Sequence, residues 1–105
     1  MKQLFDWKER QIRFTEERRG HIKENHPEMF RQFSKIKETL RNPDIVKKSK
    51  TDDAVSLAYK HYPKTPVTEK YMCIIIKSGP TDFFFVTAYF TDSIKKGELI
   101  WEKKM

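Results

Sequence analysis

The sequence predicts an α+β fold: two N-terminal helices packed on one face of a four-stranded antiparallel sheet, with a short leading strand. Two observations support this prediction. Segments with helical apolar spacing come before residue 42, and strand-like segments follow it. The clearest strand-like segments are two apolar runs, 71–77 and 83–90, which are rich in β-branched and aromatic residues and flank a turn-like spacer.

The first predicted elements are a strand and a helix. Residues 11–14 alternate apolar and polar side chains, which predicts a short strand. Thr15 is a favourable N-cap, and the two glutamates after it suit the first turn of a helix. We therefore expect a helix over residues 16–25.

A second helix is predicted over residues 27–41. Pro27 favours the first helical position and drives the residue before it out of helical geometry. Pro43 lies just beyond the end of the helix. The helix carries a regular apolar stripe of Met29, Phe33, Ile36 and Leu40.

Four strands are expected after the helices, over residues 44–50, 54–62, 71–77 and 83–90. Residues 94–105 fit either a short edge strand or a tail. Since no linker or repeat interrupts the chain, residues 1–105 are predicted to form a single domain.

The last two strands are predicted to form a hairpin with two different faces. A five-residue turn allows a register that places Lys77 opposite Phe83 and Tyr71 opposite Tyr89. One face would then be wholly apolar and would lie against the helices. Its residues are Met72, Ile74, Ile76, Phe84, Val86, Ala88 and Phe90. The opposite face would carry Tyr71, Cys73, Ile75 and Lys77 on one strand, and Phe83, Phe85, Thr87 and Tyr89 on the other.

The charge balance points to a polyanionic partner. Lys and Arg exceed Asp and Glu by 7, and the pI is about 9.5. This excess favours RNA or DNA over a membrane surface, although a self-repelling soluble surface would have the same composition. The single cysteine, Cys73, excludes a disulfide framework, and no segment predicts a membrane span or a secretory leader. We therefore expect a cytoplasmic protein.

Several classes of catalysis are disfavoured. The histidines lack the spacing of a zinc motif, so no metal site is predicted. With three glycines in the whole chain there is no glycine-rich phosphate loop, and no local motif indicates a nucleophilic triad. Metal-free cleavage of RNA remains, which needs a base, an acid and groups that stabilise the phosphate.

Histidine suits both proton transfers because its side chain titrates near neutral pH. His21, His26, Thr87 and Tyr89 lie in segments that could meet at one face of the sheet. Each also has an ordinary structural explanation. The histidines could be packed or could cap a helix, and the two strand residues fit strand propensity alone.

Three groups of residues form an ordered pattern along the chain. They are Thr15-x-Glu17-Arg18-x-x-His21-Ile22-x-x-x-His26-Pro27-Glu28, then Thr39-Leu40-x-x-Pro43-Asp44-x-Val46 with Ser49, and finally Phe85-Val86-Thr87-Ala88-Tyr89-x-Thr91 with Gly97-Glu98. In order and spacing this pattern resembles the phage-associated nuclease-like domains of the Barnase–EndoU–colicin–RelE (BECR) superfamily, over about residues 12–101.

The resemblance implies a metal-independent ribonuclease without a cofactor, directed at tRNA or ribosome-bound mRNA and found in toxin systems and mobile elements. It also implies an antitoxin or immunity protein as a possible partner. His21 and His26 become the candidate general base and acid. Thr87 and Tyr89 become candidate phosphate-binding or orienting groups.

The candidate RNA-binding residues are Lys47, Lys48, Ser49 and Lys77. Members of the family often have arginine at the positions of Lys47 and Lys48. Lysine neutralises a phosphate but lacks the bidentate fork of arginine. A basic strand and a lysine before a turn are also common as plain solvated surface.

Two functions from different classes therefore stay open. The first is an endoribonuclease that cuts by attack of the 2′-hydroxyl and leaves a 2′,3′-cyclic phosphate. The second is a non-catalytic RNA- or protein-binding module on the same fold. A toxin that needs the ribosome or one particular tRNA is a third possibility, because it would be inactive on simple RNA.

Overall fold

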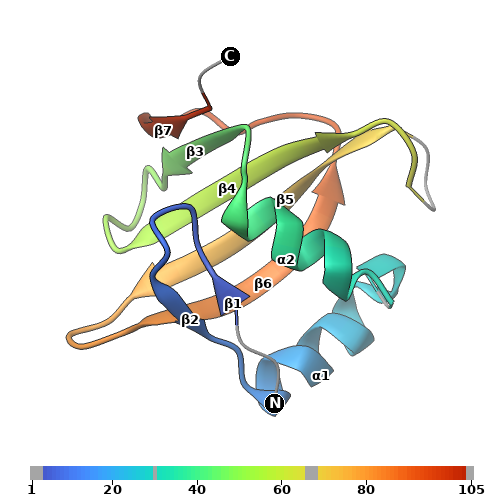
Figure 1. Cartoon of the computed structure of the whole chain (residues 1–105), viewed down its shortest axis with the longest axis horizontal. Helices are drawn as coiled ribbons and strands as arrows, with labels where there is room; N and C mark the ends of the chain where they lie inside the picture. The colour runs from blue at the N-terminus through green and yellow to red at the C-terminus, as the bar shows by residue number, and fades with distance from the viewer. Residues whose placement is uncertain (1–3, 30, 66–68, 104–105) are drawn as a thin grey trace.

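A seven-stranded sheet runs through the part of the chain that the computed structural model describes, residues 4–29, 31–65 and 69–103. The strands are β1 (Leu4–Phe5), β2 (Gln11–Arg13), β3 (Ile45–Lys48), β4 (Val55–Tyr62), β5 (Lys70–Ser78), β6 (Phe83–Thr91) and β7 (Glu98–Glu102). Their order across the sheet is β1-β2-β6-β5-β4-β3-β7 (Figure 1). β2 pairs with β6 in parallel, and the other neighbouring strands are antiparallel.

The predicted four-stranded antiparallel sheet is therefore wrong. The four expected strands are β3 to β6, but β1 and β2 extend the sheet beyond β6, and β7 extends it beyond β3. The short leading strand predicted over residues 11–14 is confirmed as β2, but its pairing with β6 was not predicted, and the two residues of β1 are too few to show a pattern in the sequence. The turn between β1 and β2 is organised by the buried carboxylate of Asp6, which accepts the backbone N–H groups of Lys8 and Arg10 at 2.9 and 3.0 Å.

The first predicted helix is confirmed as α1 (Glu16–Asn25). Thr15 caps it, because its hydroxyl oxygen accepts the backbone N–H of Arg18 at 3.2 Å. The second predicted helix is only partly confirmed, since it divides into a 3₁₀ turn, η1 (Pro27–Met29), and the helix α2 (Phe33–Arg41). Residue 30 lies outside the described residues. Arg31 has a φ of 69°, a left-handed conformation that cannot continue a helix.

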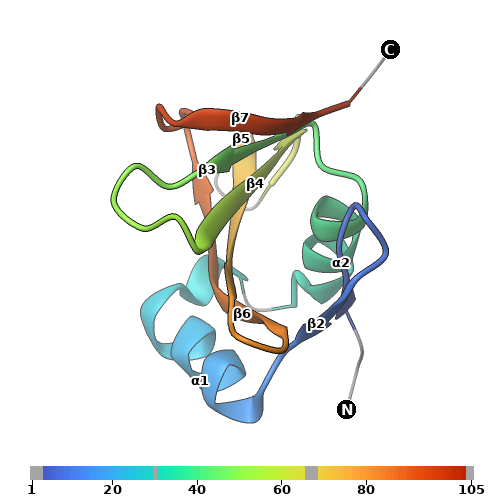
Figure 2. The ribbon, with the colours of Figure 1, turned by 90° about the vertical axis from the view of Figure 1, so that its left-hand side faces the viewer.

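The sequence predicted that both helices pack on one face of the sheet, and this prediction is wrong. α2 packs against β1, β4 and β5, whereas α1 and η1 pack along β6. Figure 2 shows α1 and α2 on opposite sides of β6. The physical reason is the edge of the sheet: β2 pairs with β6 only as far as Phe84, and the rest of that edge has no strand neighbour among the described residues. A helix alongside it covers backbone groups that would otherwise be open to pairing.

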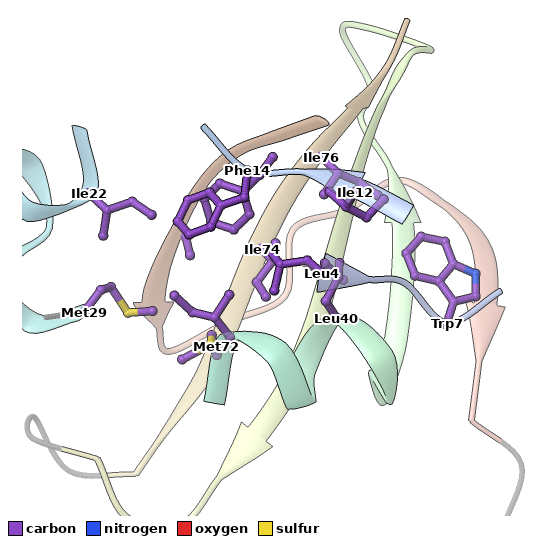
Figure 3. Packing of buried hydrophobic residues seen from close by; sticks show 14 of the residues in the cluster. Leu4, Trp7, Ile12, Phe14, Ile22, Met29, Leu40, Met72, Ile74 and Ile76 are labelled. Atoms are coloured by element: carbon purple, nitrogen blue, oxygen red, sulfur yellow. The ribbon is translucent and has the colours of Figure 1, made fainter. Parts of the chain in front are cut away.

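The main core lies between α2 and the sheet, and both helices contribute to it (Figure 3). Its fully buried side chains include Leu4, Ile12, Leu40, Met72 and Ile74, with Ile22 of α1 at the margin. The Cα radius of gyration is 12.8 Å, close to the ~13 Å expected of one folded domain of this length. Within the described ranges, no helix has the length and apolar character needed to cross a membrane.

The β5–β6 hairpin has a different register from the predicted one. Lys77 pairs with Phe84 and Tyr71 pairs with Thr91, and the register shifts between Ile75 and Ile76, where β6 carries one extra residue, a β-bulge at Val86. The bulge turns Phe85 into the core, where it is fully buried, and not onto the opposite face as expected. All residues from 83 to 86 are apolar, so the alternation could not reveal the shift.

Two glycines give opposite predictions for stability. A Cβ atom on Gly97 would lie 2.3 Å from the backbone carbonyl oxygen of Lys48, which cannot move aside easily. Gly97→Ala is therefore expected to lower the free energy of unfolding by about 1–3 kcal/mol. Urea unfolding followed by circular dichroism measures this change.

Gly20→Ala serves as the matched control. A Cβ there meets nothing within 4 Å, and Gly20 lies inside α1. This substitution is expected to raise the free energy of unfolding by about 0.5–1 kcal/mol, because alanine loses less conformational entropy in a helix. Equal effects of the two substitutions would contradict the close approach of Gly97 to β3.

Candidate functional site

The sheet has a second face, opposite to the one that α2 covers, and we call it the outer face. Two cross-strand rows define it in the register of β3 to β6. The rows are Ile45-Tyr59-Cys73-Tyr89 and Lys47-Leu57-Ile75-Thr87. The outer face therefore combines a smaller apolar cluster with Lys47 at one side and the two predicted β6 residues at the other.

One row of the outer face is closed off by the chain that links β6 to β7. Ile94 packs against the cluster of Leu57, Tyr59 and Cys73. The backbone N–H of Lys95 donates to the Tyr59 hydroxyl at 3.1 Å. Tyr59 and Cys73 consequently have no solvent-exposed surface. The neighbouring row with Ile75 and Thr87 is only partly buried.

That closed row contains three ionisable side chains, those of Tyr59, Cys73 and Tyr89. The hydroxyls of Tyr59 and Tyr89 hydrogen-bond to the Cys73 thiol. Burial raises the pKa of Cys73 to about 11 and that of Tyr59 to about 12, and it also raises the pKa of Tyr89. All three groups therefore stay protonated at neutral pH, which makes Cys73 a poor nucleophile and Tyr89 a poor base.

The two predicted histidines meet at the edge of β6. The ring centroids of His21 and His26 lie 6.2 Å apart, and the ring of His26 stacks on Tyr89 at 5.7 Å. His21 comes from α1, and His26 caps the end of that helix by donating its backbone N–H to Ile22 at 2.8 Å. The His-Pro sequence predicts this extended cap, and the cap turns His26 toward β6.

Each imidazole is held by one polar neighbour. Nδ1 of His21 lies 3.2 Å from the amide nitrogen of Asn25, one turn further along α1. Nδ1 of His26 lies 3.7 Å from a carboxylate oxygen of Glu28. Both rings are half-buried, so each keeps a solvent-accessible side. Among the described residues, these contacts involve Nδ1 of each ring and not Nε2.

Arg18 is part of this site, although the sequence assigned it no role. It precedes His21 by three residues and so lies on the same side of α1. Its guanidinium donates to the carbonyl oxygen of Val86 at 3.2 Å and lies 3.8 Å from Glu17. The spacing of Arg18 and His21 was visible in the sequence, but the bulge at Val86 that brings Arg18 to β6 was not.

The remaining predicted residues divide between the two faces of the sheet. Thr87 lies on the outer face, but its hydroxyl is buried and has no hydrogen-bond partner. Lys47 and Lys77 also lie on the outer face, and Lys77 forms an ion pair with Asp52 at 3.4 Å. Lys48 points to the other face of β3 and lies 3.8 Å from Glu98.

Ser49 and His61 lie in different parts of the sheet. Ser49 is in the turn after β3, where its hydroxyl lies 3.2 Å from the hydroxyl of Thr51. His61 lies near the end of β4 on the outer face, where it pairs with Tyr71, and it contacts Glu69 at 2.6 Å. Among the described residues, no three His, Cys, Asp or Glu side chains come together in a way that could hold a metal ion.

Comparisons with models of known protein families, with curated proteins and with solved structures each found no match to this chain. The resemblance to the BECR superfamily therefore stays a prediction.

The buried thiol and hydroxyls predict that the chain loses stability in alkali. In the unfolded chain cysteine and tyrosine release protons near their ordinary pKa values of 9.0 and 10.0, whereas the raised pKa values keep these groups protonated in the folded chain. The stability they contribute is thus present below pH 9 and is lost as the pH rises toward 12. Urea unfolding at about pH 8, 9, 10 and 11 measures this loss.

Cys73→Ala provides the control for the alkaline loss. It removes the group that titrates first, so the decline in the free energy of unfolding should begin about one pH unit higher than in the parent. A decline that is identical in the two proteins would show that the Cys73 thiol is not protected by burial.

Proposed function

We propose that this chain is a metal-independent endoribonuclease whose active site lies where α1 and η1 meet the outer face. One observation supports this proposal most directly: two half-buried imidazoles, one on α1 and one on the residue that caps it, lie 6.2 Å apart, with Arg18 on the same side of α1 as His21. Histidine pairs suit general acid–base catalysis at neutral pH, and a phosphate between them would lie within reach of both rings.

The proposed reaction needs two proton transfers. One imidazole takes the proton of the 2′-hydroxyl, and the 2′-oxygen then attacks the adjacent phosphorus atom. The bond from phosphorus to the 5′-oxygen breaks, and the second imidazole donates a proton to that oxygen. The products are a 2′,3′-cyclic phosphate and a 5′-hydroxyl. Either histidine fits either role.

Arg18 is the candidate for stabilising the phosphate in the transition state. A guanidinium has five N–H donors, so the bond to Val86 leaves others to face a phosphate. Fixed donors of this kind stabilise charge that develops during the reaction. Tyr89 is assigned an orienting role, because its ring stacks on His26 while its hydroxyl is held by Cys73.

The proposed path of the RNA crosses the outer face. Lys47 has no ion-pair partner among the described residues, and the exposed pair of Lys77 with Asp52 could exchange for a phosphate at little cost. The resemblance suggests tRNA or ribosome-bound mRNA as the substrate, with an antitoxin or immunity protein as a partner. Such substrates place the proposed activity in the cytoplasm.

A non-catalytic RNA- or protein-binding module is the second candidate. The hydroxyls of Thr87 and Tyr89 favour this candidate. The hydroxyl of Thr87 is buried, and that of Tyr89 is bound to Cys73. Neither hydroxyl is then available to a phosphate. A module of this kind would use the basic outer face without the histidines.

The test is incubation with total bacterial RNA in EDTA. The parent protein is expected to produce discrete fragments that end in a cyclic phosphate. His21→Ala and His26→Ala should each slow cleavage by about 100-fold or more, since general acid–base catalysis contributes factors of this size. Arg18→Ala should also slow it, by about tenfold or more.

Lys37→Ala is the control, because Lys37 is an exposed residue of α2, which packs on the face of the sheet opposite to the outer face. It should cut as fast as the parent, and thermal unfolding confirms that every variant is folded. Cleavage that survives both His21→Ala and His26→Ala would contradict the proposed site. Intact RNA with every protein, together with salt-dependent RNA binding, would favour the second candidate. Translating ribosomes and total tRNA are tested in parallel.

A further inference from the structure

The two imidazoles of the proposed site differ in the polar group that each one contacts. Nδ1 of His21 lies beside an amide nitrogen, whereas Nδ1 of His26 lies beside a carboxylate. A neutral imidazole carries one proton, and the contact made by one ring nitrogen decides which of the two nitrogens holds it. The two neighbours therefore decide which histidine can accept a proton at Nε2.

The contact at His21 places the proton of the neutral ring on Nε2. Nδ2 of Asn25 lies 3.2 Å from Nδ1 of His21 and also donates to the backbone carbonyl oxygen of His21 at 3.0 Å. The second bond fixes the orientation of the amide, because turning it over would place the amide oxygen against that carbonyl oxygen. An amide nitrogen only donates, so Nδ1 of His21 accepts and the proton lies on Nε2. His21 is thus in the wrong tautomer to act as a base through Nε2.

The contact at His26 favours the opposite tautomer. A carboxylate only accepts, so the Glu28 oxygen 3.7 Å from Nδ1 of His26 favours a proton on that nitrogen. This distance is longer than a hydrogen bond, and the effect is therefore electrostatic. The side chains of His26 and Glu28 are 30% and 29% exposed, which limits the screening by water. Nε2 of His26 keeps its lone pair, as a general base requires.

The backbone holds Glu28 close to His26. The N–H of His26 donates to Ile22 at 2.8 Å, and the carbonyl oxygen of His26 accepts the N–H of Met29 at 2.9 Å. Met29 is buried in the main core. Glu28 lies in η1 between these two anchored residues, and within the described ranges it has no other ion pair or hydrogen bond. No competing contact among these residues draws its carboxylate away from His26.

We propose that His26 is the general base and that Glu28 is the residue that positions it. This inference rests on the proposed ribonuclease function. Nε2 of His26 takes the proton of the 2′-hydroxyl, and the 2′-oxygen attacks phosphorus. The imidazolium that forms keeps its Nδ1 proton toward Glu28, whose negative charge stabilises it. The bond from phosphorus to the 5′-oxygen breaks, and that oxygen takes a proton from Nε2 of His21.

His21 supplies this proton in its cationic form. In that form Nδ1 also carries a proton, which the amide nitrogen of Asn25 does not accept. Asn25 must then turn its amide so that the oxygen faces the ring, and it loses the bond to the His21 carbonyl oxygen. Because this bond is exposed to water, its loss is a small cost. The acid role is therefore open to His21, whereas the base role is not.

The first test reads the tautomers by ¹H–¹⁵N NMR of the imidazole nitrogens in the parent protein. The chain has three histidines, and single substitutions assign their signals. At about pH 8, where an ordinary histidine is neutral, His26 should carry its proton on Nδ1 and His21 on Nε2. His61 is the internal reference for a proton on Nε2, because that nitrogen lies 2.6 Å from Glu69. A neutral His26 with its proton on Nε2 would overturn the proposal.

The second test is Glu28→Gln, which removes the charge and keeps the size of the side chain. It should move His26 toward the Nε2 tautomer and slow RNA cleavage by about tenfold or more, because the imidazolium loses its counter-charge. Glu102→Gln is the matched control, since Glu102 is exposed on β7, four strands from β6. It should change neither the His26 signals nor the rate. A slower rate with an unchanged tautomer in Glu28→Gln would show a structural role only and contradict the positioning role.

A substrate with a better leaving group separates the base from the acid. Replacing the 5′-oxygen at the cleavage site by sulfur gives a thiolate, which leaves without a proton from an acid. His26→Ala should slow cleavage of this RNA by about 100-fold or more, as for ordinary RNA, whereas His21→Ala should slow it by about tenfold or less. The reverse pattern, or equal effects of the two substitutions, would overturn the assignment.

These measurements distinguish a failure of this inference from a failure of the proposed function. The NMR signals need no substrate, so they test the contact between Glu28 and His26 whether or not RNA is cut. Cleaved RNA together with a neutral His26 protonated at Nε2 would refute this inference alone. Intact RNA under all conditions, ribosomes and total tRNA included, would refute the nuclease and the base together.

Discussion

The free edge of β6 is the constraint on which the rest of the structure depends. β2 pairs with this strand only over Ile12 and Arg13, so the remaining backbone groups of that edge need other cover. α1 and η1 provide it, and the carbonyl oxygen of Val86 at the bulge is bound by Arg18. A helix placed there reaches the main core with Ile22 on one side and the outer face with His26 on the other.

The candidate site follows from this placement. Because α1 lies at an edge and not over a face, the imidazoles of His21 and His26 remain half-buried and reach the rim of the outer face. The tyrosine and cysteine cluster behind them is closed and protonated at neutral pH. In the function that we propose, proton transfer therefore falls to the histidines, and the hydroxyl of Tyr89 has a supporting role.

The two ends of β6 differ in the chemistry they present. Tyr89 lies near one end, beside the histidine pair, and Phe83 lies at the other, beside Trp7 and Arg10. The first has titratable groups within reach of solvent, and the second has stacked planar groups and one buried donor without a partner.

Local sequence patterns alone determined the ends of one helix and the presence of the central hairpin. Thr15 and the His-Pro pair fixed the ends of α1, and the long apolar runs of β5 and β6 predicted a hairpin. Tertiary structure decided the rest. The bulge lies within uniformly apolar residues, and β1 has only two residues, so neither leaves a pattern in the sequence. The strand β2 was predicted, but its parallel pairing with β6 was not. The position of α1 at the β6 edge depends on backbone pairing between distant segments, which side-chain patterns do not record.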